Sequence, residues 1–174
     1  MRPFGSAQVT NGNWSKQADS CWAPAETDAR LSFVVEVGLS ESVGQLTLDA
    51  HGWLMSSNSS VNVVLTVCIR RERPEFTMQL YELQPAAHRA ATRASPLSAR
   101  CTASLTLSRL NNATSVTRIS YVNGSFAVPT TSLVLSFDKI VTRPPRNDRE
   151  GDLVVSEDEL RVFAEDIWSE QRLL

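Results

Sequence analysis

The chain has 174 residues, enough for one domain with a hydrophobic core, and its 42% hydrophobic and 21% charged residues are ordinary for a globular protein. The net charge of −2 gives no overall attraction to nucleic acid. No apolar run approaches the roughly 18 residues that cross a bilayer, and residues 1–14 lack the apolar stretch of a signal peptide. We therefore expect an intracellular protein, cytoplasmic or nuclear, without a membrane partner.

Charge is unevenly distributed. Arginines are concentrated in residues 70–118 and acids in residues 150–170. These regions either pair with each other or form a polyanion-binding face and a solvated helix, and the sequence leaves both open. The only lysines are Lys16 and Lys139, so any mechanism that needs a lysine has two candidates.

The first expected element is a loosely structured segment over residues 1–17, followed by a single domain over 18–174. Residues 18–23 suit a short strand and residues 24–30 a loop. Residues 31–37 are apolar and rich in β-branched side chains apart from Glu36. This pattern predicts a strand buried on both faces, as in the centre of an α/β sheet.

A helix is expected next, with Ser40 as its N-cap. Its apolar face consists of Val43, Leu46, Ala50, Trp53 and Leu54. Residues 56–60 end the helix in a polar turn. Residues 61–69 predict a second buried strand, and the alternation over 75–83 predicts a strand that pairs with it as a hairpin.

The remaining residues predict a β-rich extension and a C-terminal helix. Residues 84–100 suit an exposed loop, 101–107 and 115–122 a strand pair, and 132–137 a further strand. After a polar linker, Ser156 and Glu159 form a capping box ahead of an apolar stripe. The stripe is Leu160, Phe163, Ala164, Ile167 and Trp168. The fold class expected is thus α/β with a mixed sheet.

The three cysteines, Cys21, Cys68 and Cys101, form no zinc pattern, and we expect buried thiols at the first two. Glu36 carries more information, because a charge in a buried strand needs a partner or a metal. Asp19 precedes it in the chain and Asp49 follows on the predicted helix. Carboxylates placed in this way can hold Mg²⁺, which activates water for phosphodiester cleavage, usually beside a lysine.

Four segments carry a resemblance: ADSCW at 18–22, LSFVVEVGLSES at 31–42, DAHGWL at 49–54, and GDLVVS at 151–156 followed by a helix. Over residues 15–83 and 132–168 the chain resembles the restriction-endonuclease-like PD-(D/E)XK superfamily, and more closely a group of uncharacterised fungal proteins with an E-V-G-x-S-E-S motif. The resemblance implies a restriction-endonuclease-like core, with Asp19 and Glu36 as ligands of Mg²⁺ and Asp49 as a supporting polar residue. It also implies a hydrolase that acts on DNA or RNA.

The chain departs from the family pattern at the lysine. Gly38 stands at the usual lysine position, and residues 40–55 contain none. His51 is the nearby candidate for a cation or base, so the candidate catalytic residues are Asp19, Glu36, Asp49 and His51. Two functions stay open: a weak or catalytically silent nuclease, or an interaction module that binds protein or nucleic acid through residues 84–100 or a sheet edge.

A purely structural interpretation of the same residues is also open. Glu36 would then pair with an arginine such as Arg70 or Arg118, Asp19 would be an ordinary turn residue, and His51 a surface histidine.

Overall fold

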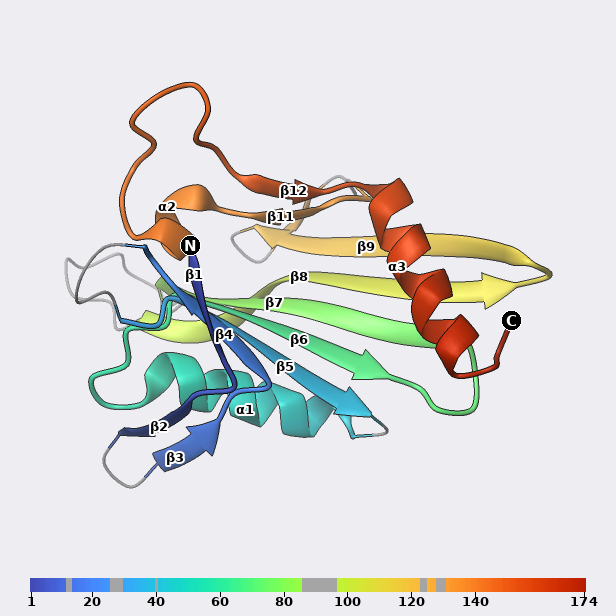
Figure 1. Ribbon diagram of the computed structural model, residues 1–174, viewed down its shortest axis with the longest axis horizontal. Helices are drawn as coiled ribbons and strands as arrows, with labels where there is room; N and C mark the ends of the chain where they lie inside the picture. Colours follow the sequence, from blue (N-terminus) through green and yellow to red (C-terminus); the bar gives the residue numbers. More distant parts are fainter. Residues whose placement is uncertain (12–13, 26–29, 40, 86–96, 123–124, 128–130) are drawn as a thin grey trace.

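An eight-stranded mixed sheet runs through the centre of this computed structural model, in the order β1-β4-β5-β6-β7-β8-β9-β10 (Figure 1). The structure describes residues 1–11, 14–25, 30–39, 41–85, 97–122, 125–127 and 131–174. The strands of this sheet are β1 (Arg2–Gly5), β4 (Ser20–Ala23), β5 (Phe33–Leu39), β6 (Val63–Ile69), β7 (Glu75–Pro85), β8 (Leu97–Leu110), β9 (Ala113–Val122) and β10 (Ser125–Ala127). Strands β5 and β6 pair in parallel, and the other neighbours pair antiparallel.

The two faces of the sheet carry different elements (Figure 1). One face is covered by α1 (Val43–Met55), beside the hairpin of β2 (Gln8–Asn11) and β3 (Trp14–Gln17). The other face carries β11 (Leu133–Leu135), α2 (Phe137–Val141), β12 (Leu153–Val155) and α3 (Glu157–Glu170). The chain therefore has the mixed α/β fold with a mixed sheet that its patterns predict. In the described part of the chain, no helix is long and apolar enough to cross a membrane.

The β5–α1–β6 unit follows the predicted pattern closely. The parallel pairing of β5 with β6 requires a crossover, and α1 supplies it. Its buried residues are Leu46, Ala50, Trp53 and Leu54, as the helical spacing predicts. The N-cap is Ser42, whose hydroxyl accepts a hydrogen bond from the Gln45 backbone N–H at 3.1 Å. The predicted cap, Ser40, lies outside the described residues.

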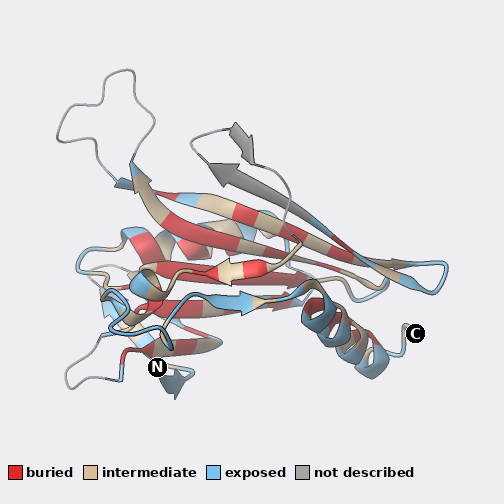
Figure 2. Ribbon diagram, turned by 90° about the horizontal axis from the view of Figure 1, so that it is seen from above, coloured by how far each residue is buried: buried red, intermediate tan, exposed pale blue. Residues whose placement is uncertain are grey.

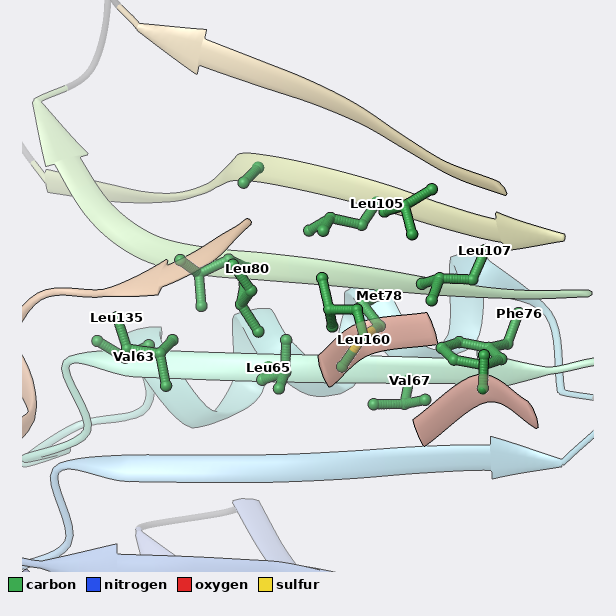
Figure 3. Close-up of a cluster of buried hydrophobic side chains, with 14 of the residues drawn as sticks. Val63, Leu65, Val67, Phe76, Met78, Leu80, Leu105, Leu107, Leu135 and Leu160 are labelled. Atoms are coloured by element: carbon green, nitrogen blue, oxygen red, sulfur yellow. The ribbon is translucent and has the colours of Figure 1, made fainter. Parts of the chain in front are cut away.

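The larger core lies between the sheet and α3 with β11, and Figure 3 shows its side chains. It is built mainly from alternate positions of β6, β7 and β8, with one residue each from β5 and β9 and with residues of β11, α2 and α3 from the covering layer. The labelled members are Val63, Leu65, Val67, Phe76, Met78, Leu80, Leu105, Leu107, Leu135 and Leu160. Burying these side chains is the main favourable term in holding the covering layer on the sheet.

Helix α3 begins with the predicted capping box, in which Ser156 and Glu159 exchange side-chain and backbone hydrogen bonds. Leu160, Ala164 and Trp168 are buried against the sheet. Figure 2 shows these buried positions along one side of the helix, with the rest of its surface exposed or half-buried. The helix therefore docks on the sheet.

Two expectations were wrong about where strands form. Residues 1–17 were expected to be loosely structured, but they contain β1, β2 and β3. These strands have four residues each, too short for a period of two to be recognised, and pairing stabilises them. Residues 84–100 were expected to form one exposed loop, but β7 continues to Pro85 and β8 begins at Leu97, while 86–96 lie outside the described residues.

The other differences are smaller. The strand expected at 132–137 is shortened to β11, because Phe137 begins α2 and donates its backbone N–H to Asp152 at 2.8 Å. Residues 26–29 of the expected loop at 24–30 also lie outside the described residues. The hairpin of β6 with β7 and the pair of β8 with β9 are confirmed, as are buried thiols at Cys21 and Cys68.

Candidate functional site

Glu36 lies on β5 with only 3% of its surface exposed, on the face that α1 covers. Its Oε1 accepts a hydrogen bond from the indole N–H of Trp53 at 2.5 Å, and its Oε2 lies 3.3 Å from Lys16 Nζ. The predicted arginine partners are not the ones the structure uses. Arg70 instead lies 4.0 Å from Glu75, and the side chain of Arg118 lies outside the described residues. The partners of the buried carboxylate therefore come from α1, through Trp53, and from β3, through Lys16.

Lys16 is the cation that lies beside Glu36. It lies on β3 and also forms an ion pair with Asp49 of α1, so one ammonium bridges two carboxylates. Its side chain is 24% exposed and that of Asp49 is 15% exposed. The ion pairs are thus largely, but not fully, shielded from solvent.

Lys16 is positioned by the packing of β3 on α1. The ring centroids of Trp14 and Trp53 lie 4.8 Å apart with an interplanar angle of 80°, an edge-to-face contact. This contact needs Gly52, because a Cβ at that position would lie 2.4 Å from Nε1 of Trp14. The absence of a side chain at Gly52 thus allows β3, which carries Lys16, to approach α1.

Asp19 lies just before β4, at the exposed edge of the site. Its Oδ2 accepts a hydrogen bond from the backbone N–H of Val37 at 2.7 Å. Because Ser20 pairs with Val35 across the two strands, Asp19 comes level with the residues around Glu36. The structure therefore brings together Asp19, Glu36 and Asp49, with Lys16 among them.

The pKa values of Glu36 and Lys16 are set by burial on one side and by their hydrogen bonds and ion pair on the other. Burial raises the pKa of Glu36 above its ordinary value, and the charge of Asp19 adds to this, while the Trp53 hydrogen bond and the Lys16 charge counteract only part of it. For Lys16, burial favours the neutral amine, but the hydrogen bond to Asp49 and the charges of both carboxylates outweigh it and raise its pKa. Lys16 is therefore firmly cationic at neutral pH.

His51 does not join this cluster. It is exposed, and its ring centroid lies 6.2 Å from that of Tyr81 in an edge contact. Among the described residues it makes no hydrogen bond or ion pair with Asp19, Glu36 or Asp49. Its exposure agrees with the interpretation of His51 as a surface histidine.

A polar row continues from Glu36 across the sheet beneath α1. Glu36 pairs in register with Thr66 on β6, and Thr66 with Gln79 on β7. Tyr81, two residues after Gln79, shares hydrogen bonds of 2.8 Å with Thr47 of α1 and 3.0 Å with Gln79. Burial raises the pKa of Tyr81. This row explains how polar groups are accommodated under the helix without leaving them unpartnered.

The second lysine forms a comparable pair on the opposite face. Lys139 of α2 lies 2.7 Å from Glu82 of β7, a residue that is 6% exposed. Glu36 and Glu82 are the buried carboxylates among the described residues, so each is matched with one of the chain's lysines. The pair of Lys139 and Glu82 offers a natural control for experiments on Lys16 and Glu36.

Asp19 and Glu36 are oxygen donors of the kind that Mg²⁺ prefers. In the described residues, no group of three or more His, Cys, Asp or Glu side chains is arranged to hold a metal ion. Mg²⁺ commonly binds through one or two carboxylates and retains several waters. Asp19 is exposed and keeps acceptor capacity beyond its hydrogen bond with Val37, whereas both oxygens of the buried Glu36 already have partners in Trp53 and Lys16.

Sequence reasoning named Lys16 as one of two candidate lysines but did not place it at the site, because β3 carries no periodic signal that places it near β5. The scarcity of lysine was the available clue, since only two lysines exist to supply a cation. With this geometry known, comparison with known proteins adds no further constraint: no family model matches the chain, and no curated protein or solved structure matches it either.

Proposed function

We propose that the chain is a weak Mg²⁺-dependent phosphodiesterase of the PD-(D/E)XK type that acts on nucleic acid. The observation that carries the proposal is Lys16 Nζ at 3.3 Å from Glu36 Oε2, because it supplies the cation whose absence at Gly38 argued against catalysis. The order of elements supports it: Asp19 before β4, Glu36 on the neighbouring β5, then α1 and a parallel β6.

In this proposal Asp19 and Glu36 would hold the metal, which when bound would lower the pKa of a water molecule and stabilise negative charge. Trp53 keeps Glu36 in place through its indole N–H. Lys16 offsets the charge of the substrate phosphate, and Asp49 orients Lys16 through their ion pair. His51 has no role.

The test is cleavage of supercoiled DNA and of single-stranded RNA by the purified chain with Mg²⁺ or Mn²⁺. We expect slow cleavage that is abolished by EDTA, by Glu36→Gln and by Lys16→Met. Lys139→Met removes a lysine from a comparable buried pair on the other face and should retain cleavage. Cleavage that persists in Glu36→Gln comes from another source and would contradict the proposal, as would a wild-type chain that neither cleaves nor binds metal by calorimetry.

A second candidate is a non-catalytic module that keeps this fold and binds nucleic acid or protein. Both oxygens of Glu36 already have partners in Trp53 and Lys16, so the cluster is stable without a metal. The candidate surfaces are the edge strands β1 and β10 and the arginine-rich region 84–100, most of which lies outside the described residues. Nucleic-acid binding without cleavage, with affinity that falls steeply as salt rises, would favour this function.

A further inference from the structure

A pocket of about 430 Å³ opens beside Trp53, outside the cluster of Lys16 and Glu36. It is walled by Phe4, Val9, Leu31, Trp53 and Val61, which come from the N-terminal strands, the start of the β5 segment and the end of α1. Its volume falls in the range typical of small-molecule sites, which are mostly apolar with a few polar groups. The pocket thus has the size and the wall of a ligand site.

The hydroxyl groups of the two serines that line the pocket already donate hydrogen bonds within the protein. Ser59 donates to the carbonyl of Trp53, and Ser60 donates to the carbonyl of Leu31 at 2.8 Å. These hydroxyls fix the turn that forms the floor and have no proton left for a ligand. Recognition of a polar ligand group therefore falls to the other polar side chains of the pocket.

The charge at the pocket is positive. Arg30 lines it and is exposed, and within the described ranges no carboxylate forms an ion pair with it. The guanidinium of Arg2 lies 4.9 Å from the ring centroid of Phe4, another lining residue. Among the residues that the structure describes, no acidic side chain lines the pocket. An apolar wall with a guanidinium group at its edge complements an anion that carries an apolar body.

We propose that this pocket binds a small amphipathic carboxylate, with its apolar part against Phe4, Val9 and Leu31 and its carboxylate on Arg30. The proposal is independent of nuclease activity. Trp53 borders the pocket but is only 1% exposed, and its indole N–H donates to Glu36. A ligand seated beside this ring should therefore shift the NMR signal of that N–H.

The experiment titrates the full chain with octanoate, and in parallel with 1-octanol, using calorimetry and ¹H–¹⁵N NMR of the indole N–H signals. Trp53→Phe identifies the Trp53 signal. Arg30→Gln removes the charge, Ala7→Phe fills the pocket from another lining residue, and Arg149→Gln is a control at an exposed arginine of the 142–152 segment.

We expect saturable binding of one octanoate, with the Trp53 signal shifting in step. Arg30→Gln should weaken binding at least about tenfold, the effect of losing one charged hydrogen bond, while Arg149→Gln changes it less than about twofold and Ala7→Phe abolishes it. Octanol should bind more weakly than octanoate. Equal affinity in Arg30→Gln and wild type, or no saturation with octanoate, would overturn the proposal. So would co-sedimentation with phosphatidylserine vesicles in place of octanoate binding, which would make the surface a membrane contact.

Discussion

The indole of Trp14 packs edge to face on the indole of Trp53, with ring centroids 4.8 Å apart, and this contact holds β3 against α1. Trp14 lies two residues before Lys16, so the packing of one tryptophan sets the position of the ammonium beside Glu36. The local arrangement of the site therefore depends on a hydrophobic contact outside the cluster of charges.

Two glycines of α1 should respond oppositely to alanine. A Cβ at Gly52 would lie 2.4 Å from Trp14 Nε1, whereas a Cβ at Gly44 would have its nearest contact at 3.7 Å, with Ser42. Alanine favours a helix over glycine by about 1 kcal/mol, so Gly44→Ala should stabilise the chain by about 0.5–1 kcal/mol. Gly52→Ala should destabilise it despite the same propensity gain, because Trp14 must move. Urea unfolding followed by tryptophan fluorescence measures both, and a stabilising Gly52→Ala would contradict the packing.

Removing Lys16 should destabilise the fold in a manner that depends on pH. Glu36 has a raised pKa, so its contribution to stability is fullest below pH 4.5 and declines as pH rises through its folded-state pKa. Lys16→Met raises that pKa further, so its cost should be small near pH 4 and about 1–3 kcal/mol at pH 7, below the cost of breaking a fully buried pair because Lys16 is partly exposed.

The double variant Lys16→Met with Glu36→Gln provides the control for this prediction. Since it removes both charges of the pair, it should recover part of the stability that Lys16→Met loses at pH 7. Denaturant unfolding at the two pH values compares the wild type with both variants. A loss of stability that is the same at pH 4 and pH 7 would show that Lys16 does not stabilise ionised Glu36.

Glu150 should titrate at an unusually low pH. Two Arg143 hydrogen bonds of 2.7 Å, together with the backbone N–H of Arg146, lower its pKa from 4.5 to about 2. Its contribution to stability is therefore present above pH 4.5 and is lost as pH falls toward 2. NMR titration should give a pKa near 2 in the wild type and a value closer to 4.5 in Arg143→Gln. The neighbouring Arg149→Gln should leave the low value unchanged, and a shift of equal size there would point to general charge effects.

Helix α3 should tolerate truncation of a side chain to alanine only on its outer side. Leu160 is 1% exposed in the larger core, whereas Val162 is 60% exposed on the outer side. Leu160→Ala should cost about 2–5 kcal/mol of unfolding free energy through lost burial and the cavity that remains, and Val162→Ala less than about 0.5 kcal/mol. Equal effects in thermal or urea unfolding would mean that the helix does not dock as described.

The parts of the fold that could be predicted have strong local signals. The apolar run around Glu36 and the helical spacing up to Leu54 predicted β5 and α1, and the Ser156 capping box predicted the start of α3. The short strands β1 to β3 depend on partners distant in sequence or on a tight hairpin, so four residues alone carry too little pattern.

The same limit explains what was missed at the site. Glu36 and Asp19 were recognisable because a carboxylate in or beside an apolar strand is unusual, and their closeness follows from β4 pairing with β5. Lys16 was named as a candidate lysine but could not be placed at the site, because only the tertiary packing of Trp14 over Gly52 brings it to Glu36. His51 was chosen for its chemistry and its nearness in sequence, but its position on α1 leaves it in solvent.

Because each lysine serves a buried glutamate, amine chemistry has an unusual meaning for this chain. Acetylation of Lys16 or Lys139 would remove an ammonium and leave an interior carboxylate without its counter-charge, so the modification would act on folding and not only on the surface. Reductive methylation retains the positive charge and should be tolerated. Labelling of the lysine amines should therefore use reagents that preserve their positive charge. A chain that carries acetyl-lysine should show a lower melting temperature.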